Sequence, residues 1–279
     1  GKVNPSGKLA ETFPVKIEDN PTHIAWAGEE DKTYYNEGPF VGYRYYDEKK
    51  LKTLFPFGYG LSYSQFEFSD INIDKTQFSE SDQIMLTVWV KNNSKFAGQE
   101  VVQLYIRDQK SSVMRPEKEL KHFTKVFLKP GEKKQVSFTL SNRDFAFFSA
   151  KYNQWMSESG DFSIMVGNSS QNLPLQQTAT LTVMKPPKQH FSRYSLVKEL
   201  KTHPVGSKII GKMMQSLNAT FPSKATPEEP TETEKVNAMK SALLRESLIN
   251  DLPINKLVSF SRGKLSMAEL DKIIALLNQ

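Results

Sequence analysis

The chain of 279 residues contains no cysteine and few histidines. Without cysteine it can form neither a disulfide nor a thiolate metal site. This absence is typical of proteins from a reducing compartment, so we expect a cytoplasmic location. The histidines do not stand at ligand spacing from one another or from carboxylate pairs, so we expect no metal and no cofactor. They are His23, His122, His190 and His203.

The sequence also lacks a long apolar run and a basic stripe. No apolar stretch reaches the roughly 18 residues that a membrane span needs, and the opening residues do not have the pattern of a signal peptide. The net charge is +6, but the 37 lysines and arginines are spread among 31 acids. A phosphate backbone requires clustered positive charge. We therefore expect contact with neither a membrane nor a nucleic acid.

Residues 1–63 are rich in aromatic residues, glycine and proline, and they have little helical periodicity. Within them, 7–14 is predicted to form a short strand that ends at a proline, and 17–35 a long polar loop. A segment of about sixty residues with scattered apolar positions is too short to bury a core of its own. We expect it to depend on another part of the protein.

Residues 64–185 alternate apolar and polar side chains with the period of two that is typical of β-strands. The turn at 129–132 contains Pro-Gly and predicts that the strands on its two sides pair as a hairpin. Several short strands with regular turn signals predict a β-sandwich of the immunoglobulin or fibronectin type III kind. The predicted strands cover 83–90, 98–107, 122–128, 134–140, 160–167 and 177–183.

Consecutive prolines at 186 and 187 end the strand pattern, and residues 186–279 change to helical periodicity. Residues 221–233 are rich in proline, glutamate and threonine and are predicted to be a flexible linker. We expect the helices to pack on the sandwich or on a neighbouring domain, since isolated helices are marginally stable. The predicted helices cover 192–202, 205–217, 233–250 and the residues after Ser266. The helix at 233–250 has an apolar side formed by Val236, Met239, Leu243 and Leu248. In the last helix Ser266 forms a capping box with Glu269, and the apolar residues that follow at helical spacing are Leu270, Ile273, Ile274 and Leu277.

Glu37 is the candidate acid of greatest interest, because it lies among several tyrosines. The apolar face of a sugar ring stacks on aromatic side chains, and a few placed polar groups fix its orientation. Glu37, Tyr43 and Arg44 are therefore candidates for the rim of a sugar-binding site. The alternative is structural: Glu37 pairs with Arg44 or caps a backbone turn. The neighbouring tyrosines are Tyr34, Tyr35, Tyr45 and Tyr46.

Other groups have simpler interpretations. Arg115 and Glu119 are interpreted as contacts that fix a loop or an interface between domains. Trp89 and Trp155 are of the type that stacks on sugars, but we interpret them as packing anchors of the sandwich or its interface. A calcium site is a further alternative, since acids at strand ends are suitable ligands. These acids are Asp70, Asp74, Asp82 and Asp108.

Three groups of motifs together resemble the family 3 glycoside hydrolases of the β-glucosidase type. The resemblance covers residues 1–183, and the tail is similar to a C-terminal extension of some bacterial members. The motifs are GKLAETFP at 7–14; EGPFVGYRYYD at 37–47 with FPFGYGLSY at 55–63; and, in the β region, GQEVVQLY at 98–105, RPEKEL at 115–120, KPGE at 129–132 and Trp155 with Ser159-Gly160. In the tail they are LPINKL at 252–257 and SRGKL at 261–265.

The resemblance implies three parts: the last segment of an α/β sandwich domain at 1–63, a fibronectin type III-like domain at 64–185 and a helical extension at 186–279. It also implies a parent enzyme that hydrolyses terminal, non-reducing β-D-glucosyl residues with retention, which requires two carboxyl groups. In the family both lie before the part matched here. We therefore expect no catalytic residue in this chain and no activity from it alone.

The resemblance also implies partners. These are the N-terminal barrel and the rest of the α/β sandwich domain of the same enzyme, together with a β-glucoside substrate, and the helical tail offers a surface for a homodimer. The alternative function is a stand-alone carbohydrate-binding or adhesive β-sandwich. Such a module has no use for residues 1–63. A part of a larger enzyme, by contrast, should expose a large apolar surface where the other domains dock.

Overall fold

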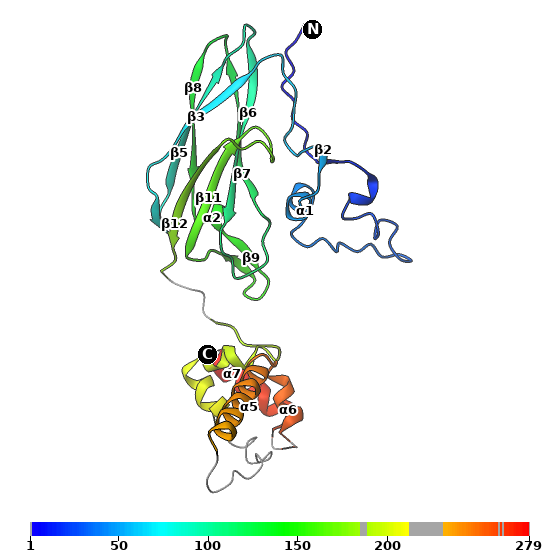
Figure 1. Cartoon of the computed structure of the whole chain (residues 1–279), viewed down its shortest axis with the longest axis vertical. Coiled ribbons are helices and arrows are strands. Elements are labelled where there is room, and N and C mark those ends of the chain that lie inside the picture. The colour runs from blue at the N-terminus through cyan, green and yellow to red at the C-terminus, as the bar shows by residue number, and fades with distance from the viewer. Residues whose placement is uncertain (1, 185–188, 212–230, 262, 264, 279) are drawn as a thin grey trace. The chain divides into compact units, whose positions relative to one another are not determined.

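The computed structural model describes residues 2–184, 189–211, 231–261, 263 and 265–278. The chain divides into two compact units, Gly1–Pro186 and Pro187–Gln279 (Figure 1). The first unit holds a β-sandwich and the N-terminal segment, and the second unit is helical. Among the residues described, no helix combines the length and the apolar character needed to cross a bilayer.

The predicted β-sandwich is confirmed. Its core lies between two sheets, because alternate side chains of each strand point to the same side. The five-stranded sheet consists of β4 (Gln77–Ser79), β12 (Leu175–Thr182), β11 (Gly160–Gly167), β6 (Gly98–Asp108) and β7 (Glu119–Leu128), in that order. The three-stranded sheet consists of β3 (Phe66–Ile73), β5 (Ile84–Asn92) and β8 (Lys133–Leu140).

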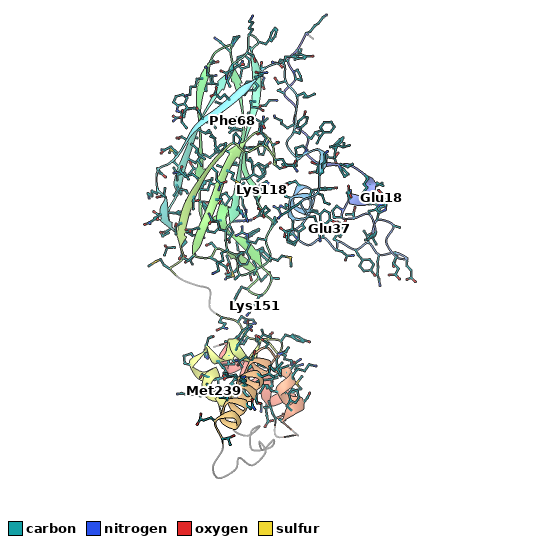
Figure 2. The ribbon with its side chains drawn as sticks, viewed as in Figure 1. Glu18, Glu37, Phe68, Lys118, Lys151 and Met239 are labelled. Carbon is teal, nitrogen blue, oxygen red and sulfur yellow. The ribbon has the colours of Figure 1, made fainter. Side chains whose placement is uncertain are left out.

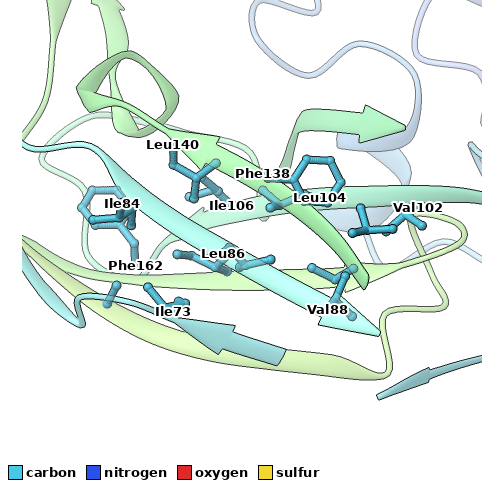
Figure 3. Packing of buried hydrophobic residues seen from close by; sticks show 14 of the residues in the cluster. Ile73, Ile84, Leu86, Val88, Val102, Leu104, Ile106, Phe138, Leu140 and Phe162 are labelled. Carbon is cyan, nitrogen blue, oxygen red and sulfur yellow. The ribbon is translucent and has the colours of Figure 1, made fainter. Parts of the chain in front are cut away.

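The buried side chains of the two sheets meet in one apolar cluster (Figure 3). Leu86 of β5, Leu104 of β6 and Phe162 of β11 are all fully buried within it. Each belongs to a run in which every second residue is apolar, so the predicted alternation of β5 and β11 places the core residues correctly.

The predicted hairpin around 129–132 is wrong. β7 pairs with β6 and β8 pairs with β5, so this turn carries the chain from one sheet to the other. The turn is anchored at the end of β5, where the backbone nitrogen of Gly131 donates to the oxygen of Asn92 at 3.0 Å. A Pro-Gly turn reverses the chain but does not decide which strands pair. Leu128 and Val136 point into the same core from opposite sheets.

The N-terminal segment packs on the outer face of the five-stranded sheet (Figure 1). Gln103 and Tyr105 of β6 lie on this outer face, yet both are buried because the segment covers them. β1 pairs with β2, so the strand predicted at 7–14 is reduced to its last two residues. The elements of the segment are β1 (Phe13–Pro14), η1 (Ile17–Asp19), α1 (Tyr43–Glu48) and β2 (Thr53–Phe55).

A short connecting segment lies between β8 and β11 in the sequence. It consists of α2 (Asn142–Phe145) followed by a two-stranded sheet of β9 (Phe147–Ser149) and β10 (Gln154–Met156). Ser141 caps α2 in a capping box with Asp144. Phe145 is fully buried against Phe78 and Phe162, and it fixes the start of the β9–β10 hairpin to the core.

The helices of the second unit share an apolar core of their own, which includes Leu200, Leu257 and Leu270. The predicted capping box is confirmed: the Ser266 hydroxyl accepts from the backbone nitrogen of Glu269 at 3.2 Å. The helices are α3 (Val197–Lys201), α5 (Glu232–Asn250), α6 (Asn255–Phe260) and α7 (Met267–Leu277), and residues 204–211 are also helical.

Four predictions for this part of the chain need comment. The apolar side chains expected to pack from α5 are instead exposed, and they are Val236, Met239, Leu243 and Leu248. The proline boundary at 186–187, most of the linker predicted at 221–233 and the end of the helix predicted at 205–217 lie outside the described residues.

Candidate functional site

Tyr43, the first residue of α1, seats the N-terminal segment on the sandwich. Its buried ring stacks on Phe57 at 4.8 Å between centroids and meets the ring of Tyr105 edge-on at 5.9 Å. Its phenol oxygen accepts a hydrogen bond of 2.8 Å from the backbone nitrogen of Leu120 on β7. Burial raises the pKa of the phenol above its ordinary value. Tyr43 therefore joins the segment to both β6 and β7 as a neutral group.

Glu119 of β7 is the centre of a buried ion-pair network. It binds Arg44 of α1 at 2.9 Å and Arg115, from the loop before β7, also at 2.9 Å. Arg115 in turn binds Asp108 at 3.2 Å and the backbone oxygen of Phe145 at 3.0 Å. The side chain of Arg115 is 7% exposed and that of Glu119 15%. The network therefore connects α1, β6, β7 and the end of α2 away from solvent.

The charges of this network set the protonation of Glu119. Burial alone would raise the pKa of its carboxyl, but Lys121, Arg115 and Arg44 outweigh burial and lower that pKa below its ordinary value. Burial lowers the pKa of Lys121, although Glu119 lies 3.3 Å away and acts in the opposite direction. Glu119 is thus ionised at neutral pH and holds both arginines through charge-assisted hydrogen bonds.

Two further ion pairs join the same surfaces. Asp47 of α1 binds Lys118 at 2.8 Å, and Lys8 binds Glu100 of β6 at 2.7 Å. Figure 2 shows Lys118 between the sandwich and α1. All four side chains are largely buried. The N-terminal segment is therefore held along its length rather than at one point.

Gln103, an uncharged side chain of β6, also holds the N-terminal segment to the sandwich through hydrogen bonds. Its side-chain nitrogen donates to the backbone oxygens of Gly58 at 3.2 Å and Asn168 at 2.6 Å, and its side-chain oxygen accepts from the Tyr105 hydroxyl at 2.7 Å. This arrangement needs Gly58, whose φ of 79° is left-handed and where an added Cβ would collide with the Gln103 amide.

A cavity of about 510 Å³ lies where α1, the loop before β7 and the β9–β10 hairpin meet. We call it the hairpin cavity. Pro39 and Arg44 form one wall, residues 113–116 with Glu119 the second, and residues 146–151 with Trp155 the third. Its volume is in the range of protein recognition pockets.

Trp155 stands at the edge of the hairpin cavity. Its ring meets Phe148 edge-on at 5.5 Å and carries the Arg143 guanidinium 3.0 Å from its centroid. Trp89 lies on the outer face of the three-stranded sheet, with the Lys133 ammonium 5.0 Å from its ring. Both tryptophans therefore lie outside the sandwich core, and Trp155 lines the hairpin cavity.

The structure brings together two of the three predicted rim residues. Tyr43 and Arg44 both meet β7, but Arg44 pairs with Glu119 and not with Glu37. Glu37 lies in a turn in which its backbone oxygen accepts from the nitrogen of Phe40 at 3.0 Å. Figure 2 shows Glu37 on the N-terminal segment. Of the two structural alternatives for Glu37, Arg44 thus pairs with Glu119 instead, while Glu37 does lie in a backbone turn, and the rim role stays a prediction.

The aspartates considered for calcium bind separate partners. In the part of the chain that the structure describes, no group of three or more His, Cys, Asp or Glu side chains is placed to hold a metal ion. Asp70 pairs with Lys133, Asp82 with Lys75 and Asp108 with Arg115, and Asp74 accepts from the backbone of Met85.

The interpretation of Arg115 and Glu119 as loop-fixing and interface contacts agrees with the structure, but their partners Arg44 and Asp108 were not foreseen. Asp47, Lys118 and Gln103 were missed altogether. Gln103 gave one signal: it is a polar residue inside the near-continuous apolar run of β6, where a lone amide must find partners.

The comparisons agree with this architecture. The family model for a fibronectin type III-like domain matches residues 100–170. A thermostable β-glucosidase B from Acetivibrio thermocellus is 41% identical over 278 residues, which is 100% of this chain and 35% of that protein. An exo-α-(1→6)-L-arabinopyranosidase from Bifidobacterium longum is 39% identical over 91% of this chain and 32% of that protein.

A solved structure agrees as well. The crystal structure of the Bifidobacterium adolescentis GH3 β-glucosidase superposes with a TM-score of 0.65 at 42% identity, and the match covers 75% of this chain and 31% of that one. The chain thus spans about a third of the length of the relatives it matches. Its motifs, its sandwich and these similarities agree: the chain belongs to the family 3 glycoside hydrolases of the β-glucosidase type and corresponds to their C-terminal portion.

Proposed function

We propose that the chain is the C-terminal part of an enzyme that hydrolyses terminal, non-reducing β-D-glucosyl residues with retention. The observation that carries this proposal is the 41% identity to a β-glucosidase along 278 residues, that is, across both units. Similarity confined to the sandwich would support a shared fold and no more.

Retaining hydrolysis requires two carboxyl groups about 5 Å apart, one as nucleophile and one as acid and base. We assign neither to this chain and place both in the barrel and the remaining α/β sandwich portion of the longer protein. The chain's own contribution is then mechanical. The networks around Glu119, Asp47 and Gln103 hold residues 2–63 on the sandwich, so that the segment is presented in a fixed conformation.

The surface of the N-terminal segment supports this role. Ile24 is 98% exposed, and Trp26 and Tyr35 are also highly exposed. Large apolar groups concentrated on one segment are unusual for a free surface and are typical of an interaction site. We propose that the upstream domains cover this segment, with Glu37 near the rim of the substrate site and Tyr43 and Arg44 positioning it.

The test is hydrolysis of an aryl β-glucoside by the purified chain and by the longer protein, with the intact mass verified on the same samples. We expect the longer protein to be active and the chain to be inactive. Activity of the 279-residue chain itself would overturn the proposal, because the carboxylate pair would then lie within it. Unchanged kinetics of Glu37→Gln in the longer protein would remove Glu37 from the rim.

One observation favours a second substrate class. Relatives at 39–40% identity act as exo-α-(1→6)-L-arabinopyranosidases according to their names. Assays of the longer protein should therefore compare an aryl β-D-glucoside with an aryl α-L-arabinopyranoside. A higher kcat/KM for the arabinopyranoside would change the proposed substrate but not the role of this chain.

A further inference from the structure

One side of α5 carries five large apolar side chains that are exposed to solvent. Met239 is 66% exposed, and Leu244 and Leu248 are each 63% exposed. Val236 and Leu243 are exposed as well. Figure 2 shows Met239 on this helix. We call these five side chains the α5 face.

The spacing of the five side chains places them on one side of the helix. Val236, Met239 and Leu243 follow one another at intervals of three and four residues, and the two leucines beside them are four residues apart. An α-helix has 3.6 residues per turn, so these intervals return to the same side. Ile249, which packs against the apolar core of the second unit, points to the opposite side. α5 is therefore held to its unit on one side and exposes the α5 face on the other.

The α5 face is large for an exposed apolar surface. Monomeric proteins seldom expose a contiguous apolar patch of more than a few hundred Å². Two such faces packed together would remove five large side chains of each copy from water, an area on the order of the 1,000 Å² that a specific interface needs. The α5 face is thus sufficient for an interface with one other apolar surface.

The charges next to the α5 face fit a second copy of the chain in the antiparallel orientation. Lys240 precedes Leu243 by three residues, Glu246 follows it by three, and both charged side chains are exposed. When two α5 helices cross at Leu243 in opposite directions, Lys240 of each copy therefore lies opposite Glu246 of the other. A parallel pair would place Lys240 opposite Lys240, which is unfavourable.

The carboxylate of Glu246 is available for this contact. Its Oε1 atom binds Lys201 at 2.9 Å, but the pair lies at the surface, and the side chain of Glu246 is 59% exposed. A carboxylate has two oxygens and can accept from more than one cation. The contact with Lys201 therefore does not prevent a second contact with Lys240 of another copy.

A membrane surface fits the α5 face less well. Helices that lie on membranes are typically rich in lysine and arginine on their polar side. α5 carries three basic and three acidic residues, so it has no excess of positive charge. They are Lys235, Lys240 and Arg245, and Glu232, Glu234 and Glu246.

The domains common to β-glucosidases also fit less well as the partner. A β-glucosidase from Bacteroides ovatus matches over 62% of this chain, and the crystal structure of a Kluyveromyces marxianus β-glucosidase matches over 65%. These shares are about the size of the first unit, which holds 186 of the 279 residues. A surface of the second unit therefore calls for a partner other than the domains that these enzymes share.

We infer that the α5 face joins two copies of this chain through an antiparallel, two-fold symmetric pair of α5 helices. A second copy supplies an identical apolar face and the complementary charges in equal amount. The homodimer expected from the helical tail thereby receives a defined interface. This inference goes beyond the proposed function and does not depend on it, because the interface lies in the second unit.

The test is the molar mass of the purified chain and of the longer protein, measured by light scattering after size exclusion. We expect dimers, and we expect Leu243→Glu to raise the dissociation constant by about tenfold or more, because it buries two carboxylates at the symmetry axis. Leu276→Glu, at an exposed leucine of α7, is the matched control and should stay dimeric. Equal dissociation constants for the wild type and Leu243→Glu, or a monomeric wild type, would overturn the inference.

An exchange of charges tests the orientation of the two helices. Lys240→Glu and Glu246→Lys each place like charges opposite one another, so each should weaken the dimer. The double variant restores opposite charges and should recover the dissociation constant of the wild type. A double variant that is no better than the single ones would overturn the antiparallel pair. Circular dichroism of each variant verifies that the helices are intact.

The same measurements identify a different partner. If the upstream part of the longer protein covered the α5 face, that protein would be monomeric, and Leu243→Glu would lower its Tm without changing its mass. This outcome would also overturn the inference. Lack of β-glucosidase activity in the longer protein would reject the proposed function, while the masses would still decide whether α5 joins two copies.

Discussion

The phenol oxygen of Tyr43 accepts a hydrogen bond from the backbone nitrogen of Leu120, 77 residues along the chain. The bond ties α1 to the edge strand β7, and the tyrosine ring seals the joint against Phe57 and Tyr105. Residues 2–63 thus depend on the sandwich, as their composition predicted. Tyr43 therefore contributes to stability in two ways, through the hydrogen bond of its hydroxyl and through the packing of its ring, and substitutions can remove the hydrogen bond alone or both.

Tyr43→Phe keeps the ring and deletes the acceptor, which leaves the Leu120 amide without its partner. We expect a loss of about 1–3 kcal/mol in the free energy of unfolding, and about 3–5 kcal/mol for Tyr43→Ala, which also opens a cavity. Denaturant unfolding followed by tryptophan fluorescence measures this, since all three tryptophans lie in the first unit. Tyr35→Phe, at an exposed tyrosine, is the control and should match the wild type. Equal stability of Tyr43→Phe and the wild type would mean that this bond is not formed.

Arg115 and Glu119 should be strongly coupled because their pair is buried. Arg115→Ala leaves the buried carboxylate of Asp108 without its ion-pair partner and removes one of the three cations around Glu119, and we expect it to destabilise by about 3–5 kcal/mol. A double-mutant cycle with Glu119→Gln should give a coupling energy of about 0.5–3 kcal/mol. The exposed pair Arg107–Glu117 is the control, where Arg107→Ala should change stability by about 0–1 kcal/mol. Additive effects of the two buried substitutions would contradict the network.

The pKa of Glu119 predicts a pH dependence with a definite sign. Burial opposes ionisation, but Lys121, Arg115 and Arg44 lower the pKa below the ordinary 4.5. A group whose pKa is lowered by folding stabilises the protein fully above its unfolded value, and this contribution is lost as the pH falls through the folded value. We therefore expect the stability difference between wild type and Glu119→Gln to be constant near neutrality and to shrink on acidification below about pH 4.5. A difference that does not change down to acid unfolding would refute this assignment.

The capping box of α7 offers a prediction for the second unit. Ser266→Ala removes the acceptor for the backbone nitrogen of Glu269, and a lost N-cap typically costs about 0.5–2 kcal/mol. The second unit contains no tryptophan, so thermal unfolding should be followed by the helical circular-dichroism signal. The first unit's fluorescence transition should stay in place. Ser241→Ala, at an exposed position inside α5, is the matched control and should not destabilise.

The sandwich was predictable because its signal is local. In β5 the inward residues Ile84, Leu86, Val88 and Val90, and in β11 the inward residues Phe162, Ile164 and Val166, are apolar at every second position, so a short window of sequence identifies both the strand and its buried face. The pairing of strands is a different question. The alternation in β7 and β8 is satisfied whichever sheet each strand joins, as long as Leu128 and Val136 reach the core. Periodicity therefore gave the strands but not the hairpin.

The contacts between the N-terminal segment and the sandwich were less predictable, because they also join residues that are far apart in sequence. Arg115 and Glu119 are four residues apart and could be considered together, but Arg44 is far from both in sequence. Charged residues are common on any surface, and no local pattern distinguishes a buried pair such as Asp47–Lys118 from a solvated one. The aromatic cluster at 43–46 is evident in the sequence, but its composition suits a sugar platform as well as a packing anchor.

The close approach of Gly58 to Gln103 can be tested by substitution. Gly38 provides the comparison, because it shares the left-handed backbone conformation but has no close neighbour. Gly58 and Gly38 both have positive φ, of 79° and 57°, but a Cβ would strike the Gln103 amide at Gly58 and meet open space at Gly38. Gly38→Ala should therefore cost about 1–2 kcal/mol of backbone strain, and Gly58→Ala should add about 1–3 kcal/mol for disrupted hydrogen bonds of Gln103. Fluorescence-detected unfolding measures both, and proteolysis within 17–35 should be faster in Gly58→Ala as the segment loosens. Combining Gly58→Ala with Gln103→Ala should cost less than the sum of the single substitutions, because the collision is then relieved. Equal effects of the two glycine variants would mean that the close approach of Gly58 to β6 does not hold the segment in place.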